Sequence, residues 1–268
     1  MDIPATEIGT RPFGDTPDVR MFWATDHTNH AFCSLLANIK AAIPLQLVIA
    51  EPGNGKTLLC RKLFNSLRAH RTRYRVSMFP YPHLSYDDLT RKFRCRNDGR
   101  SAVNHGARQN VLIIDEAQAL PDKTLLVLGK QLEQEATLFQ LVLFAQPELE
   151  SRLKQPLLRI FQDLPQERYY LNSLSKSEIA CYIGYRMKLA GLMPGQMPDK
   201  AVVDLVFRAS NGIPRLINTI MRKALNVAET SQSGRLGVEH IRAACETIET
   251  PWSVANPASR SKGALIWS

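Results

Sequence analysis

The sequence lacks paired cysteines, abundant aromatic residues and any long hydrophobic run. Its five cysteines are odd in number, widely spaced and include no CxxC pair, which argues against a disulfide framework or a zinc module and favours a reducing compartment. Aromatic residues make up only 7% of the chain, so a rich set of stacking platforms for nucleic-acid bases is excluded.

Signals for export or membrane insertion are missing as well. Residues 1–18 contain proline, glycine, aspartate and threonine, without the basic start and apolar core of a secretory signal. The longest apolar run, around Leu141–Ala145, is far below the roughly 18 residues that indicate a membrane span. We therefore expect a cytoplasmic protein with no transmembrane segment, and peripheral attachment at the inner membrane stays open.

The composition is that of a soluble globular protein with a basic surface. The 268 residues are 44% hydrophobic and 22% charged, enough for one large domain or two small ones. The net charge of +9 favours an anionic partner, such as a nucleotide, a nucleic acid or an acidic membrane face. A basic protein without such a partner is an equally good interpretation.

Over the first two thirds of the chain, apolar runs alternate with segments whose apolar residues recur at helical spacing. This alternation predicts a parallel α/β sheet. The runs at 45–50, 110–115 and 140–145 are continuous, as in strands buried on both faces, and 75–80 is more mixed. Residues 169–174 are a candidate for a further strand. Helices are expected at 28–40, 57–70, 85–94 and 122–137.

The pattern changes near residue 175, where Ser175 and Glu178 have the spacing of a capping box. Helices are expected from there at 176–190, 199–209, 214–229 and 238–248, so we predict a smaller all-helical domain. The expected organisation is an arm and first helix at 1–40, an α/β domain at 41–174, a helical domain at 175–250 and a loose tail at 251–268.

The segment AEPGNGKT at 50–57 matches the phosphate-loop pattern GxxxxGK[ST] except at its first glycine, which is Ala50. Glycines at 53 and 55 allow backbone N–H groups to surround phosphate oxygens, and the following helix directs its amino end at the same anion. Ala50 is harmless if its φ is negative. The alternative is a glycine-rich turn with a solvated lysine. The candidate nucleotide-binding residues are Glu51, Pro52, Gly53, Asn54, Gly55, Lys56, Thr57 and Leu58.

Within this loop Lys56 is predicted to reach the β- and γ-phosphates, and Thr57 to place its hydroxyl on Mg²⁺. In the segment VLIIDEAQAL, two carboxylates directly follow the apolar run VLII. Asp115 is the second candidate Mg²⁺ ligand, and Glu116 is a candidate to polarise the attacking water. The alternative is a pair of acidic residues that opens a turn. The predicted cofactors are therefore ATP and Mg²⁺.

Two further polar residues are catalytic candidates. Gln146 directly follows an apolar run and could contact the γ-phosphate, although starting a proline-containing turn explains it equally well. Arg215 follows Pro214 at the start of a helix, where a cation is unfavourable unless an anion faces it. A surface arginine is the alternative for Arg215.

With these segments placed, residues from about 12 to 248 resemble the AAA+ ATPases of the ExeA/GspA general secretion group. The resemblance rests on PFGDTPDVRMFW, GNGKTLLCRKLFNSL, LIIDEAQALPDKTL, QLVLFAQPELESRL and ASNGIPRLINTIMRKAL followed by VEHIRAA. It implies a P-loop NTPase sheet with a helical lid, Walker A at 50–57 and Walker B at Asp115 and Glu116. It also implies sensor roles for Gln146 and Arg215, homo-oligomers, and partners among pilus or secretion assembly proteins.

Three departures from that family pattern bear on turnover. Ala50 replaces a glycine, the stretch at 85–109 is short, and Leu164 stands where the family tends to place an arginine finger, with Arg159 and Arg168 nearby. A finger contributes roughly 10³-fold or more to rate. Two other functions therefore stay open: a DNA-binding ATPase that works beside a transposase, and a nucleotide-binding scaffold with weak hydrolysis.

Overall fold

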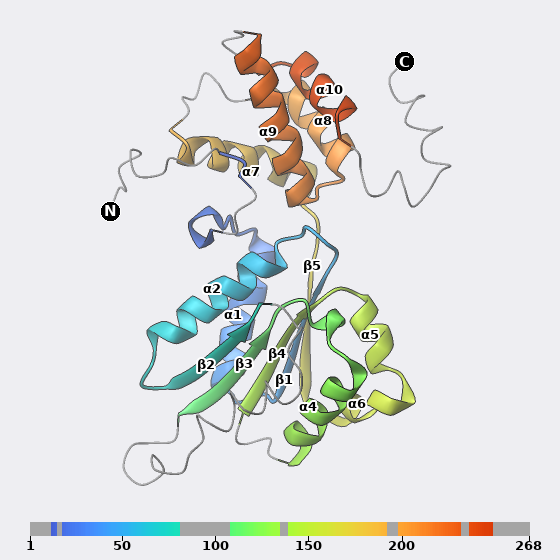
Figure 1. Ribbon diagram of the computed structural model, residues 1–268. Coiled ribbons are helices and arrows are strands. Elements are labelled where there is room, and N and C mark those ends of the chain that lie inside the picture. Colours follow the sequence, from blue (N-terminus) through green and yellow to red (C-terminus); the bar gives the residue numbers. More distant parts are fainter. Residues whose placement is uncertain are drawn as a thin grey trace. The chain divides into compact units, whose positions relative to one another are not determined.

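The computed structural model describes residues 12–14, 18–80, 108–134, 139–191, 198–231 and 236–248. The chain divides into two compact units (Figure 1). One spans Pro17–Asn172, and the other combines Met1–Thr16 with Ser173–Ser268. No helix among the described residues is both long and apolar enough to cross a bilayer.

The first unit, the α/β unit, is built on a sheet of five strands in the order β2-β3-β4-β1-β5, and all neighbours are parallel. The predicted parallel sheet is therefore confirmed. Because parallel strands are covered by helices on both faces, their sequences are continuously apolar. The strands are β1 (Leu45–Ala50), β2 (Tyr74–Phe79), β3 (Gln109–Ile114), β4 (Phe139–Ala145) and β5 (Gln166–Leu171).

Helices cover each face of this sheet (Figure 1). On one face α1 (Asp26–Lys40) and α2 (Lys56–Ala69) pack against Val48, Ile113 and Phe144, while α4 (Asp122–Gln134) packs against Leu47, Leu112 and Leu143 on the other. Successive residues of a strand alternate between the faces, so both helical layers draw on the same apolar runs. Shorter elements complete the unit: η2 (Val19–Met21), η3 (Ala117–Ala119), α5 (Glu148–Leu153), η4 (Pro156–Leu158) and α6 (Ile160–Asp163).

Several element boundaries differ from the sequence-based expectation. The first helix begins at Asp26 rather than 28, because Thr25 caps it by accepting the backbone N–H of Thr28. The last strand is 166–171 rather than 169–174, since Gln166 already pairs with Leu45 of β1. The helix expected at 85–94 lies outside the described residues, and the one at 122–137 is described as far as Gln134.

The second unit, the helical unit, contains α7 (Lys176–Leu189), α8 (Lys200–Ser210), α9 (Pro214–Thr230) and α10 (Val238–Glu246), close to the expected helices. The capping box between Ser175 and Glu178 is present. Residues near the amino terminus join this unit: Phe13 is fully buried, and the buried Arg186 of α7 donates hydrogen bonds to the carbonyls of Pro12 and Gly14.

Candidate functional site

The loop between β1 and α2 has the backbone that phosphate binding requires. Its left-handed residues are Gly53 (φ 90°) and Gly55 (φ 86°), where a side chain would be strained. Ala50 is the last residue of β1 and pairs with Leu171. Its backbone is therefore extended, and the missing first glycine causes no strain there. Within the loop, Asn54 is buried, whereas Glu51 and Pro52 are exposed and Leu58 is half-buried.

Lys56, the first residue of α2, lies folded back over the loop. Its side chain is nearly buried, with 4% of the residue exposed, and Nζ donates hydrogen bonds to the carbonyls of Ala50 (2.5 Å) and Glu51 (3.0 Å). An ammonium group in this position neutralises an anion bound by the loop amides, and its present acceptors are carbonyl oxygens that a phosphate can replace. The helix amino end that follows favours the same anion.

The acidic pair lies directly beside this loop. Asp115 follows β3 and is 3% exposed. Burial raises the pKa of its carboxyl, while a hydrogen bond from Thr57 and the charge of Lys56 act in the opposite direction. The contact between Thr57 and Asp115 therefore joins two segments that are far apart in the sequence, at the carboxyl ends of β1 and β3, where α/β sheets bind ligands.

Glu116 and Gln146 also come together at this edge, through a residue that the sequence analysis did not single out. Glu116 has a left-handed backbone (φ 53°). Its Oε2 accepts hydrogen bonds from Nε2 of Gln118 at 2.5 Å and from Nε2 of Gln146 at 3.3 Å. Gln118 stands between two alanines in the segment DEAQAL, and that isolated polar side chain was the available signal.

Arg215 belongs to the helical unit rather than to this cluster. It lies in the first turn of α9, directly after Pro214, and its side chain is exposed. Among the described residues, no carboxylate pairs with its guanidinium group. The site described so far comes from the α/β unit alone, and the sensor role of Arg215 stays a prediction.

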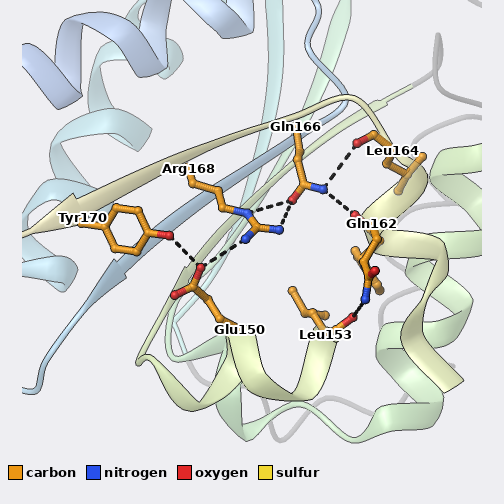
Figure 2. Close-up of polar contacts among 8 residues, drawn as sticks. Glu150, Leu153, Gln162, Leu164, Gln166, Arg168 and Tyr170 are labelled. Atoms are coloured by element: carbon orange, nitrogen blue, oxygen red, sulfur yellow. Dashed lines mark hydrogen bonds and ion pairs between the residues drawn. The ribbon is translucent and has the colours of Figure 1, made fainter. Parts of the chain in front are cut away.

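The region expected to hold an arginine finger is built differently. Leu164 is 8% exposed and packs in the core beneath α4. Figure 2 shows that Arg168 on β5 is held in place by its neighbours. It donates to Oε1 of Gln166 at 3.1 and 3.2 Å and pairs with Oε1 of Glu150 at 3.4 Å, which also accepts from the hydroxyl of Tyr170. Arg159, near the start of α6, is exposed.

The residues at the loop fit a nucleoside triphosphate with Mg²⁺. A threonine hydroxyl beside a buried carboxylate supplies oxygen ligands, which Mg²⁺ prefers. The described residues include no group of three or more His, Cys, Asp or Glu side chains placed to bind a metal by themselves.

A parallel sheet in this strand order, a phosphate loop after β1 and an acidic pair after β3 define the fold of a P-loop NTPase of the AAA+ class. Residues 44–153 match the family model of the AAA domain. Over 238 residues the chain is 31% identical to general secretion pathway protein A of Aeromonas hydrophila. The aligned region covers 81% of this chain and 43% of that protein. The chain thus spans less than half the length of this relative.

Solved structures share the fold at low sequence identity. RuvB of Thermotoga maritima, a Holliday junction branch migration motor, aligns with a TM-score of 0.59 and 18% identity over 87% of this chain and 72% of RuvB. Cdc6p of Pyrobaculum aerophilum aligns with a TM-score of 0.63 and 18% identity over 87% of this chain and 69% of the Cdc6p chain. These similarities bear on the fold alone.

Proposed function

We propose that the chain binds ATP with Mg²⁺ at the carboxyl edge of its sheet and hydrolyses it. The observation that carries this proposal is the hydrogen bond between Thr57 and Asp115, because it brings the phosphate loop and the acidic pair to one place. A glycine-rich turn with a merely solvated lysine does not account for a Lys56 side chain that is 4% exposed and folded over the loop.

Each residue has a defined part in this proposal. Lys56 would neutralise the β- and γ-phosphates, while Thr57 and Asp115 would hold Mg²⁺. Glu116 polarises the attacking water, and Gln146 contacts it or the γ-phosphate. Bound there, Mg²⁺ would offset the negative charge of the phosphates. The exposed loop residues Glu51 and Pro52, with Gly53, Asn54, Gly55 and Leu58, complete the phosphate and nucleotide contacts.

Calorimetric titration with ATP and Mg²⁺ tests the binding step. We expect saturable binding to the wild-type protein and to Lys40→Ala, whose lysine lies exposed at the end of α1. Lys56→Ala should weaken binding at least about 100-fold, because a buried charge-assisted contact to phosphate is lost. Equal affinity of Lys56→Ala and the wild type would remove the basis of the proposal.

A role in an envelope machine is the finer proposal. Its support is the 31% identity to a general secretion protein and the resemblance of the motif segments to the MSHA pilus biogenesis protein MshM. On this basis the chain acts as a homo-oligomer with pilus or secretion assembly proteins as partners, at the cytoplasmic side of the inner membrane. In a deletion strain, the wild type and Lys40→Ala should restore piliation or secretion and Lys56→Ala should not.

A second function, nucleic-acid binding, is favoured by one surface cluster. Arg68 lies in the last turn of α2, and Arg71 and Arg73 lie between α2 and β2. Arg108 precedes β3, where the N–H of Gln109 donates to the carbonyl of Arg73. Within the described residues, no ion pair joins these four arginines to a carboxylate. Planar guanidinium groups suit phosphate oxygens. The transposition-type alternative therefore has a specific surface to test.

Duplex DNA binding at several salt concentrations decides this alternative. We expect the logarithm of affinity to fall steeply with the logarithm of salt, and the slope to decrease by about two when Arg71 and Arg73 are both changed to alanine. The control is Arg208→Ala with Arg242→Ala in the helical unit, which removes the same charge. Equal slopes for the two double variants would exclude this surface as a DNA site.

A further inference from the structure

The side chain of Gln118 connects two parts of the candidate site. Its Nε2 donates to Oε2 of Glu116 at 2.5 Å, and its Oε1 accepts the backbone N–H of Gln146 at 3.2 Å. A carboxylate only accepts and a backbone N–H only donates, so these two partners define which way the amide faces. Gln118 thus ties Glu116, two residues after β3, to Gln146, the residue directly after β4.

The backbone that carries Gln118 is itself clamped. Arg152 of α5 donates hydrogen bonds to the carbonyl oxygens of Gln118 and Leu120, and it pairs with the carboxylate of Asp122 at the start of α4. One guanidinium group therefore fixes the turn from Gln118 to Asp122 at three points. A side chain projecting from a turn held in this way has a defined position, which is what supports a precisely oriented neighbour.

The two amide donors converge on one oxygen of Glu116. Gln118 and Gln146 both donate to Oε2, and no described residue donates to Oε1. The strained left-handed backbone of Glu116 (φ 53°) persists because its surroundings hold it. Oε2 is thus tethered by two donors, which leaves Oε1 as the carboxylate oxygen available to a further donor.

We propose that Gln118 is a positioning residue, which holds Oε2 of Glu116 so that Oε1 is aligned with the water that attacks the γ-phosphate. This inference rests on the proposed ATP hydrolysis and assigns a residue to it that acts only through Glu116. Alignment of a general base is worth a large factor in rate, whereas ground-state binding of the nucleotide does not depend on it.

The test is steady-state ATP turnover by Gln118→Leu, which keeps the size of the side chain and removes both hydrogen bonds. We expect kcat to fall roughly 10- to 100-fold while KM and the Kd for ATP with Mg²⁺ stay at wild-type values. Gln162→Leu, at an exposed glutamine of α6, is the matched control and should retain wild-type kcat. A purely structural role would lower the Tm and change KM together with kcat.

A double-mutant cycle with Glu116→Gln completes the test. If Gln118 acts through Glu116, then Gln118→Leu should cause no further loss in the Glu116→Gln background. An equal loss in both backgrounds, or a kcat of Gln118→Leu at or above the wild-type value, would overturn the inference and leave ATP hydrolysis standing. No turnover by the wild-type protein would overturn the proposed function itself and this inference with it.

Discussion

Two polar clusters of the α/β unit contain similar residue types but differ in burial. At the phosphate loop Lys56 and Asp115 are 4% and 3% exposed. In the β5 cluster, formed by Arg168 and Tyr170 of β5 with Glu150 of α5, the side chains of Arg168 and Glu150 are 35% and 18% exposed, and the three residues bond to one another (Figure 2). Burial of a charge is costly unless it is compensated. The comparison teaches that burial at strand ends, rather than the number of hydrogen bonds, separates a candidate site from a surface network.

The largest expected contrast is between the same substitution in the two clusters. Glu116→Gln should lower kcat by about 10²- to 10⁴-fold, because it removes the group that polarises water. ATP binding should be retained, so the variant traps bound ATP. Glu150→Gln, on the β5 cluster, should leave kcat near the wild-type value. Radiolabelled phosphate release and nucleotide retention on a desalting column measure the two properties.

Equal turnover by Glu116→Gln and Glu150→Gln would break the comparison in an informative way. If neither variant differs from the wild type and the wild-type rate is itself low, the chain acts as a nucleotide-binding scaffold. If Glu150→Gln is the slower variant, the β5 cluster belongs to the catalytic machinery.

The effect of Asp115→Asn on the Tm, and its dependence on pH, tests whether the carboxylate at the phosphate loop is buried at a cost to stability. Burial raises the pKa of Asp115, so its protonated form stabilises the fold. This contribution is fully present below the unfolded value of 3.8 and is lost as pH rises through the folded-state pKa. At pH 7, above the unfolded value, Asp115 therefore makes the nucleotide-free protein less stable than a neutral side chain would. We expect Asp115→Asn to raise its Tm at pH 7 by a few degrees and to abolish the further rise that ATP with Mg²⁺ causes.

The control for this measurement is Asp163→Asn, at an exposed aspartate of α6, whose Tm should match the wild type. Differential scanning fluorimetry from pH 7 downward should show the difference between Asp115→Asn and the wild type narrowing towards pH 3.8. A lower Tm of Asp115→Asn at pH 7 would mean that the carboxylate is stabilised by its surroundings, contrary to the burial argument.

The sheet was predictable because its central strands are buried on both faces. The runs that form β1, β3 and β4 are continuously apolar and were located to within one residue. The edge strand β5, QERYYL, was misplaced because most of its residues reach solvent, so no apolar run marks its start. The short α5 and α6 were missed, since elements of six and four residues show no helical periodicity.

The site residues that local sequence patterns mark were predictable, and those that depend on contacts in the folded chain were not. The loop at 50–57 and the pair Asp115 and Glu116 follow from local patterns, and the structure brings these segments together. Gln118 could not be assigned because its partners, Glu116 and the backbone of Gln146, meet only in the folded sheet. The harmless conformation of Ala50 likewise depends on its pairing with Leu171, which local sequence does not contain.

The smallest expected effect is that of Arg168→Ala. Exposed ion pairs contribute at most about 1 kcal/mol to stability, so the Tm should hardly change. Because Arg168 is already held by Glu150 and Gln166, we also expect the kcat of Arg168→Ala to be close to the wild-type value. The kcat is measured over a range of protein concentrations, and light scattering shows at which of them oligomers form. A loss of roughly 10³-fold that appears only where oligomers form would instead identify Arg168 as a finger acting on a neighbouring copy. In that case Arg168 would leave Glu150 and contact a phosphate of the nucleotide bound to the neighbouring copy, and the β5 cluster would take part in the reaction.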